Sequence, residues 1–104
     1  RRNEFRRRRD YIVPALRNAG LPVPVTPDGA FYAWADCSAH SDDSWRFALE
    51  LLERIHVSVV PGKDFGHHDP SRYLRLSYAN SMERLQEAIA RIERYLPGRE
   101  RPRS

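Results

Sequence analysis

The chain has 104 residues, enough for one ordinary domain with a modest core but too few for an enzyme of two domains. Hydrophobic residues make up 40% of it and charged residues 31%, a balance that indicates a globular protein and excludes a disordered one. No apolar run approaches the roughly 20 residues that span a bilayer, and no signal-peptide pattern opens the chain. We therefore expect a cytoplasmic protein without a membrane partner.

The formal net charge of +4 raises the question of a nucleic-acid partner. Arginines are concentrated at the two ends of the chain, and four of them form the run 6–9. No aromatic residues alternate with this run, and no signature of a nucleic-acid-binding fold accompanies it. We interpret the run as the solvated side of a helix and expect no nucleic-acid partner. The alternative is a small basic nucleic-acid-binding module, which salt-dependent binding of DNA or RNA would reveal.

Two further groups of reactive residues do not make convincing sites. The single cysteine, Cys37, excludes an internal disulfide and is expected to be a small buried or loop residue. The cluster His67-His68-Asp69, with His56 as a further donor, could suggest a metal site. Adjacent histidines on a loop do not converge easily on one ion, so we expect no metal.

The first element is a helix, because apolar residues recur at helical spacing over residues 5–19 and the charged run 6–10 occupies the other side. Gly20 supplies the stop. Pro14 lacks an amide hydrogen and should kink or split the helix near Val13.

The next segment, 21–29, contains three prolines and a Pro-Asp-Gly turn signal, which predicts an extended connection. The aromatic-rich residues 31–36 then predict a first strand that ends in a polar loop. Apolar residues return at helical spacing over 44–55, with Asp43 or Ser44 placed to cap the free amides. This pattern predicts a second helix.

Residues 57–60 are mostly β-branched and stop at a Pro-Gly pair, which predicts a short second strand and a turn. Residues 73–79 then form the third predicted strand. Successive strand side chains point to opposite faces, so one face should carry Leu74, Leu76 and Tyr78. Because helices must cover that apolar face, Arg75 should project from the other one, together with Tyr73, Ser77 and Ala79.

A last helix follows, with Asn80 or Ser81 as its cap and Glu83 as the return arm of a capping box on Asn80. Its apolar stripe extends from Leu85 to Leu96. The order α-β-α-β-β-α predicts an α+β fold, a two-layer sandwich of a short, mostly antiparallel sheet with helices packed on one face. We assign residues 1–98 to one domain and 99–104 to a flexible tail.

Three motifs occur in order along this pattern. They are Pro-Asp-Gly-Ala-Phe-Tyr at 27–32, Val-Val-Pro-Gly-Lys-Asp-Phe-Gly at 59–66 and Leu-Arg-Leu-Ser-Tyr-Ala at 74–79. Their order and spacing resemble the C-terminal small domain of class I/II aminotransferases of fold type I, which use pyridoxal 5'-phosphate (PLP). The resemblance covers roughly residues 4–96.

The resemblance implies that Arg75 binds the α-carboxylate of the substrate, for which a guanidinium offers a planar fork of donors. Residue type alone favours an ordinary salt bridge on a sheet edge for Arg75, and only the surrounding family motif favours the carboxylate role. Ser77 could orient the guanidinium or be a solvated hydroxyl. Phe31 and Tyr32 could approach the substrate channel, and core packing should explain one of the two because they point opposite ways.

The resemblance also implies a larger parent that transfers an amino group between an amino acid and a 2-oxo acid. Its large domain would bind PLP, and the parent would be a homodimer. Lys63 follows a Pro-Gly turn and not the family's Schiff-base motif, so we expect this chain to contain no catalytic or cofactor-binding residue, to bind no PLP and to be inactive alone. The alternatives are the aminotransferase-like effector domain of a bacterial transcription regulator and a related PLP lyase.

Overall fold

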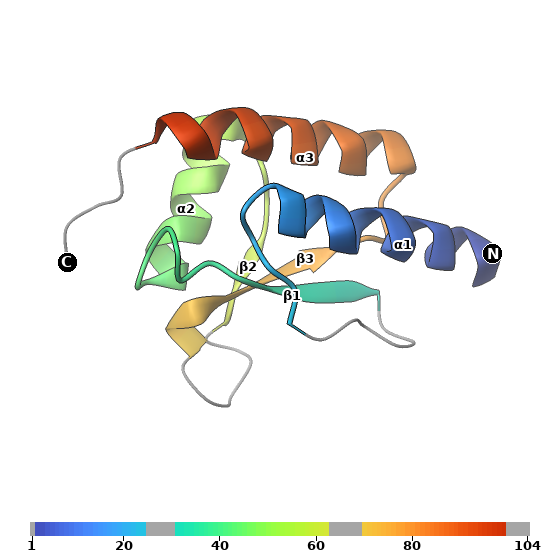
Figure 1. Ribbon diagram of the computed structural model, residues 1–104, viewed down its shortest axis with the longest axis horizontal. Helices are drawn as coiled ribbons and strands as arrows, with labels where there is room; N and C mark the ends of the chain where they lie inside the picture. The colour runs from blue at the N-terminus through green and yellow to red at the C-terminus, as the bar shows by residue number, and fades with distance from the viewer. Residues whose placement is uncertain (1, 25–30, 63–69, 100–104) are drawn as a thin grey trace.

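The computed structural model describes residues 2–24, 31–62 and 70–99, and its α+β architecture confirms the predicted fold class (Figure 1). The predicted turn at 27–29 and the loop 63–69 lie outside the described residues. The elements are α1 (Arg2–Asn18), β1 (Tyr32–Asp36), α2 (Ser44–Ile55), β2 (Val60–Pro61), β3 (Tyr73–Ser77) and α3 (Met82–Tyr95), with 3₁₀ turns η2 (Pro70–Arg72) and η3 (Leu96–Gly98). No helix among the described residues is long and apolar enough to cross a membrane.

The three strands form one antiparallel sheet in the order β1-β3-β2, so β3 is the central strand. In the register of the sheet, Trp34 of β1 lies opposite Arg75 of β3, and Val60 of β2 lies opposite Arg75 from the other side. Figure 1 shows α1 and α3 together above the strands, on the same side of the sheet. This arrangement leaves the other side of the sheet without a covering helix among the described elements.

The core lies between the sheet and the helices, and the strand alternation predicted from the sequence is confirmed. Leu74, Leu76 and Tyr78 are at most 5% exposed, as are Ala33 and Ala35 on the paired strand. The helices contribute further large buried side chains: Ile12, Leu16, Phe47, Leu51, Ile89 and Ile92. Each such side chain stabilises the fold by about 1.5–3 kcal/mol relative to exposure, so this single core holds both layers together.

Helix α1 continues without a break through Pro14, so the predicted split near Val13 is wrong. Pro14 has no amide hydrogen to donate to the Asp10 carbonyl. Both residues lie on the exposed side of the helix. On the opposite side, Ile12 and Leu16 are buried in the core. Packing of that apolar side therefore outweighs the one missing hydrogen bond. The predicted stop at Gly20 agrees with its left-handed backbone, at φ 96°.

The N-terminal caps of α2 and α3 are both residues that the sequence predicted as caps. Asp43 caps α2, since its carboxylate accepts a hydrogen bond from the Arg46 amide at 3.2 Å. The cap of α3 is Ser81, whose hydroxyl accepts from the Arg84 amide at 3.2 Å. The alternative capping box on Asn80 is therefore wrong, because the helix begins one residue later than that box requires.

The second strand is shorter and later than predicted, beginning at Val60 and not at residue 57. Helix α2 ends at Ile55, and its C-cap residue His56 has a left-handed backbone at φ 58°. The Val57 amide still donates to the Leu51 carbonyl at 3.2 Å. The β-branched residues that follow therefore lead the chain away from the helix end before sheet pairing starts.

Arg99, the first residue of the predicted tail, connects three parts of the fold. Its side chain is only 4% exposed, and its Nε donates to Glu50 on α2 at 2.5 Å. It also donates to the His40 carbonyl at 2.9 Å and lies over the Phe47 ring at 4.9 Å. The Tyr95 hydroxyl at the end of α3 donates to the same Glu50 carboxylate. Residues 100–104 lie outside the described part of the chain.

The Glu50 carboxylate should stabilise the fold in a pH-dependent way. The hydrogen bond from Arg99 holds the pKa of Glu50 below its ordinary value of 4.5. A lowered carboxyl pKa gives stability that is complete above 4.5 and is lost as the pH falls through the folded-state pKa. We expect Glu50→Gln to lower the free energy of unfolding by about 1–3 kcal/mol at neutral pH, with the difference from wild type shrinking in acid.

Urea denaturation of both proteins, at neutral pH and well below the ordinary carboxyl pKa, measures this difference. Glu53→Gln is the matched control, because Glu53 lies on the same helix and is exposed. A Glu50→Gln effect equal to that of the control, or independent of pH, would contradict the assignment.

Candidate functional site

The candidate site is the side of the sheet that faces away from the core, which we call the outer face. Alternation along β1 and β3 places six side chains there, and cross-strand pairing brings them together: Tyr32, Trp34, Asp36, Tyr73, Arg75 and Ser77. Arg75 is in the middle of this set because β3 is the central strand. Its side chain is half-buried, as expected for a residue flanked by strands on both sides.

The guanidinium of Arg75 lies over an aromatic ring. Its Cζ is 4.9 Å from the centroid of the Tyr32 ring. The Tyr32 and Trp34 rings meet edge to face, with centroids 6.0 Å apart and planes at 80°. A guanidinium over a ring uses its flat face, so its in-plane N–H donors can serve a second partner. The arrangement is therefore compatible with binding a planar anion.

The acidic side chain of the outer face, Asp36, is engaged by other residues. Its Oδ2 accepts from Arg72 Nε at 3.0 Å, and its Oδ1 accepts from the Ser38 amide at 2.8 Å. Burial raises the pKa of Asp36, but hydrogen bonds from Ser38 and Arg72 outweigh burial and lower it overall. Within the described ranges, no aspartate or glutamate forms an ion pair with Arg75.

The other residues singled out in the sequence take different positions. Phe31 is 53% exposed and packs against Phe5 of α1, with ring centroids 4.8 Å apart, and Tyr32 is 38% exposed. The expectation that core packing explains one of this pair is therefore wrong. The Ser77 hydroxyl is exposed and accepts from the Ala79 amide at 3.2 Å, an interaction local to the end of β3.

Sequence reasoning missed Trp34 and the Asp36–Arg72 pair as parts of this face. Alternation along the first strand was enough to place Trp34 on the same side as Tyr32. The register that sets Trp34 opposite Arg75 is a property of two strands about 40 residues apart in sequence. No local pattern encodes that register.

The described residues do not fit a metal or a Schiff-base cofactor. They contain no group of three or more histidine, cysteine or acidic side chains that could hold a metal ion, and His67-His68-Asp69 lies outside the described ranges. The only lysine of the sequence, Lys63, also lies outside them. The described side chains of the outer face therefore include no amine to which PLP could be attached.

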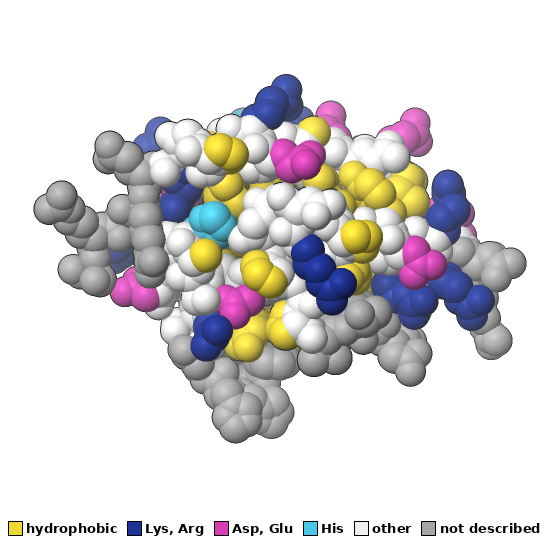
Figure 2. Space-filling model, viewed as in Figure 1, with side chains coloured by type: hydrophobic (Ala, Val, Ile, Leu, Met, Phe, Trp, Pro, Cys, Tyr) yellow, Lys and Arg dark blue, Asp and Glu magenta, His cyan; other side chains and the backbone are white. Residues whose placement is uncertain are grey.

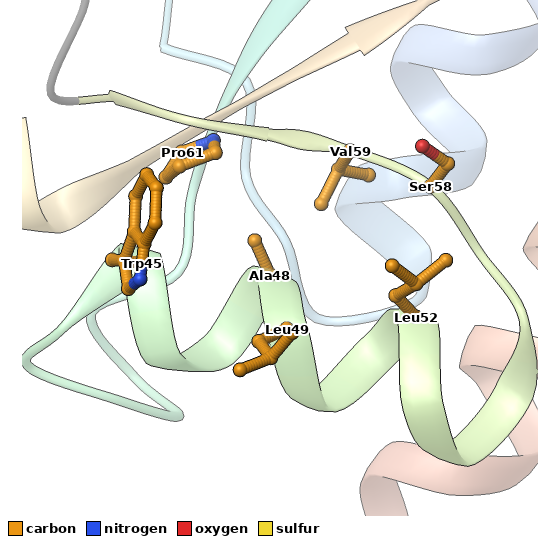
Figure 3. A pocket seen from close by; sticks show the side chains of 7 residues that line it. All are labelled: Trp45, Ala48, Leu49, Leu52, Ser58, Val59 and Pro61. Carbon is orange, nitrogen blue, oxygen red and sulfur yellow. The ribbon is translucent and has the colours of Figure 1, made fainter.

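Two other surface features do not include Arg75. An apolar groove of about 230 Å³ lies between α2 and the segment that leads into β2, with Trp45, Leu49 and Val59 among its lining side chains (Figure 3). Figure 2 shows basic side chains gathered over the N-terminal part of α1. Arg7 and Arg8 of that region both pair with Glu4 at 3.2 Å, so the basic run is partly neutralised.

Comparison with known proteins identifies the family of this chain. The family model for aminotransferase class I and II matches residues 1–92. The chain belongs to this family. It is 41% identical over 98 residues to an aspartate aminotransferase of Pyrococcus horikoshii, covering 93% of this chain and 25% of that protein. It is 44% identical over 95 residues to an aspartate/prephenate aminotransferase of Thermus thermophilus, covering 91% and 23%.

Solved structures agree in fold. An aromatic aminotransferase from Pyrococcus horikoshii superposes with a TM-score of 0.81 at 39% identity, covering 89% of this chain and 24% of that one. An aminotransferase from Mycobacterium tuberculosis gives a TM-score of 0.83 at 33% identity, covering 93% and 25%. The chain thus spans about a quarter of the length of the relatives it matches.

Cys37, next to Asp36 at the end of β1, should be an unreactive thiol. It is fully buried, and burial, with the Asp36 charge as a smaller cause, raises the pKa of the thiol to about 12. Only a thiolate reacts readily with disulfide reagents. We expect a chromogenic disulfide reagent to modify no thiol in the folded chain and one per chain in denaturant. Fast modification of the folded chain would show that this end of β1 is not packed as described.

Proposed function

We propose that residues 1–98 form the C-terminal small domain of a PLP-dependent aminotransferase, and that Arg75 binds the α-carboxylate of its amino-acid and 2-oxo-acid substrates. The observation that carries this proposal is the state of Arg75 on the outer face. The residue is half-buried and its guanidinium lies over the Tyr32 ring, while the acidic side chain of the face is held by Arg72.

The chemistry of the substrates explains why an arginine suits this role. Amino acids and 2-oxo acids share a planar carboxylate, which a guanidinium can bind through two parallel hydrogen bonds. Partial burial strengthens this charge interaction relative to the same contact in open water. A substrate held at its carboxylate has its Cα–H bond oriented, which is a positioning contribution to catalysis.

The aromatic ring of Tyr32 supports the guanidinium in this proposal. Phe31 packs against Phe5, and the Ser77 hydroxyl is engaged by the Ala79 amide. Neither is therefore assigned a contact with Arg75. Phe31 instead extends the exposed aromatic surface next to Tyr32, at the edge where a substrate channel would pass.

The cofactor belongs, in this proposal, to the part of the protein outside these 104 residues. The chain corresponds to about a quarter of each relative, and its described part contains no lysine. We infer that a large domain of the same parent binds PLP and that the parent is a homodimer, as the resemblance implies. We infer further that the parent works in the cytoplasm. The 104-residue chain alone should bind no PLP and catalyse no transamination.

Replacing Arg75 in the full-length, PLP-loaded protein tests the carboxylate assignment. A hydrogen-bonded charge interaction contributes about 1.5–3 kcal/mol, so Arg75→Leu should raise the apparent KM of both the amino donor and the 2-oxo acid at least about tenfold. Arg75→Lys, which keeps the charge but loses the planar fork, should recover only part of that loss.

Steady-state kinetics with each substrate varied in turn gives these values. Arg94→Leu is the control, because Arg94 is an exposed arginine on α3. A KM and kcat that do not change in Arg75→Leu would show that another residue binds the carboxylate.

A further inference from the structure

We propose that Arg72 is a positioning residue that keeps Arg75 available to substrate, by holding Asp36 in an ion pair of its own. The inference rests on the proposed function, because it concerns how the carboxylate site of Arg75 is kept free. It assigns a role to two residues that do not themselves touch the substrate.

The register of the sheet brings Asp36 within reach of Arg75. Asp36 lies opposite Tyr73 and Arg75 lies opposite Trp34, so Asp36 and Arg75 are diagonal neighbours on the outer face. Diagonal neighbours of an antiparallel pair are about 7–8 Å apart at Cα, a separation that long side chains can bridge. An aspartate in this place is therefore a competitor for the guanidinium that the substrate needs.

The observed contacts direct Asp36 away from Arg75. One carboxylate oxygen accepts from Arg72 Nε and the other from the Ser38 amide, at 3.0 Å and 2.8 Å. The Arg75 guanidinium lies on the ring of Tyr32, the other diagonal neighbour, which carries no charge. The two arginines thus have separate partners.

The backbone fixes Arg72 in this position. Arg72 ends the 3₁₀ turn η2 directly before β3, and its carbonyl accepts from the Cys37 amide at 2.8 Å. Cys37 follows Asp36 in the chain, so this bond places the backbone of Arg72 beside that of Asp36. The pairing is therefore built into the junction of the two strands.

The ion pair is better suited to this role than to stabilising the fold. The Arg72 side chain is 47% exposed and the Asp36 side chain 15%, so solvent at the guanidinium screens the pair and its contribution to stability is modest. Removing Arg72 should therefore leave the fold largely intact while leaving Asp36 free to turn toward Arg75. A substrate would then bind only the fraction of molecules in which Arg75 is unpaired, and its apparent affinity would fall by that fraction.

The test uses propionate, a carboxylate without an amino or oxo group, titrated into the full-length protein loaded with PLP at constant ionic strength. Its dissociation constant is taken from the absorbance change of the cofactor, so no turnover is needed. We expect Arg72→Leu to raise this dissociation constant about three- to tenfold. An ion pair between Asp36 and Arg75 would lower the fraction of molecules with a free Arg75 by roughly that factor.

The double variant Asp36→Asn/Arg72→Leu provides the decisive control, because it removes the competitor together with its partner. It should bind propionate within about twofold of wild type, as should Asp36→Asn alone. A purely structural role for Arg72 would instead leave the double variant at least as weak as Arg72→Leu. The rescue therefore separates competition by Asp36 from a folding defect.

Arg75→Leu separates this inference from the function on which it rests. If Arg75→Leu leaves propionate binding unchanged, or if wild type does not bind propionate, the proposed function fails and the inference fails with it. If Arg75→Leu weakens binding but Arg72→Leu does not, or if Asp36→Asn fails to rescue Arg72→Leu, the inference alone is overturned.

Discussion

The antiparallel pairing of β1 with β3 determines most of what this domain presents to its surroundings. Side chains alternate along both strands, so a shift of register by one residue would exchange the core face for the outer face. The observed register buries Leu74 and Leu76 under the helices and sets Trp34 opposite Arg75. The composition of the outer face, and any binding there, follows from this one set of backbone hydrogen bonds.

Two arginines of the same chain show how surroundings decide what a guanidinium does. Arg99 is almost fully buried, and its donors are used by the Glu50 carboxylate and the His40 carbonyl, so its role is to join segments of the fold. Arg75 is half-buried and lies on the Tyr32 ring. A charge placed on an aromatic ring retains donors for a further partner, whereas a charge enclosed by a carboxylate and a carbonyl does not.

The elements of the fold were largely predictable because each depends on a short stretch of sequence. Helical spacing and strand alternation gave the element order, and the cap at Asp43 follows from one side chain and the helix start beside it. The differences arise where distant contacts compete with local preference. Helix α1 continues through Pro14 because its opposite side is buried. The second strand starts only at Val60 because the residue that caps the end of α2 is left-handed.

The sequence by itself determined that Arg75 leaves the sheet on the face opposite the apolar one, because alternation is a property of a single strand. The motifs around it also gave the family. Only the tertiary structure decided which side chains surround that arginine. Three features join residues from separate strands or turns: the position of Arg75 over the Tyr32 ring, the neighbouring Trp34 and the pairing of Asp36 with Arg72. Such contacts depend on the register between strands, which is set by the packing of the whole core and not by any short stretch of sequence.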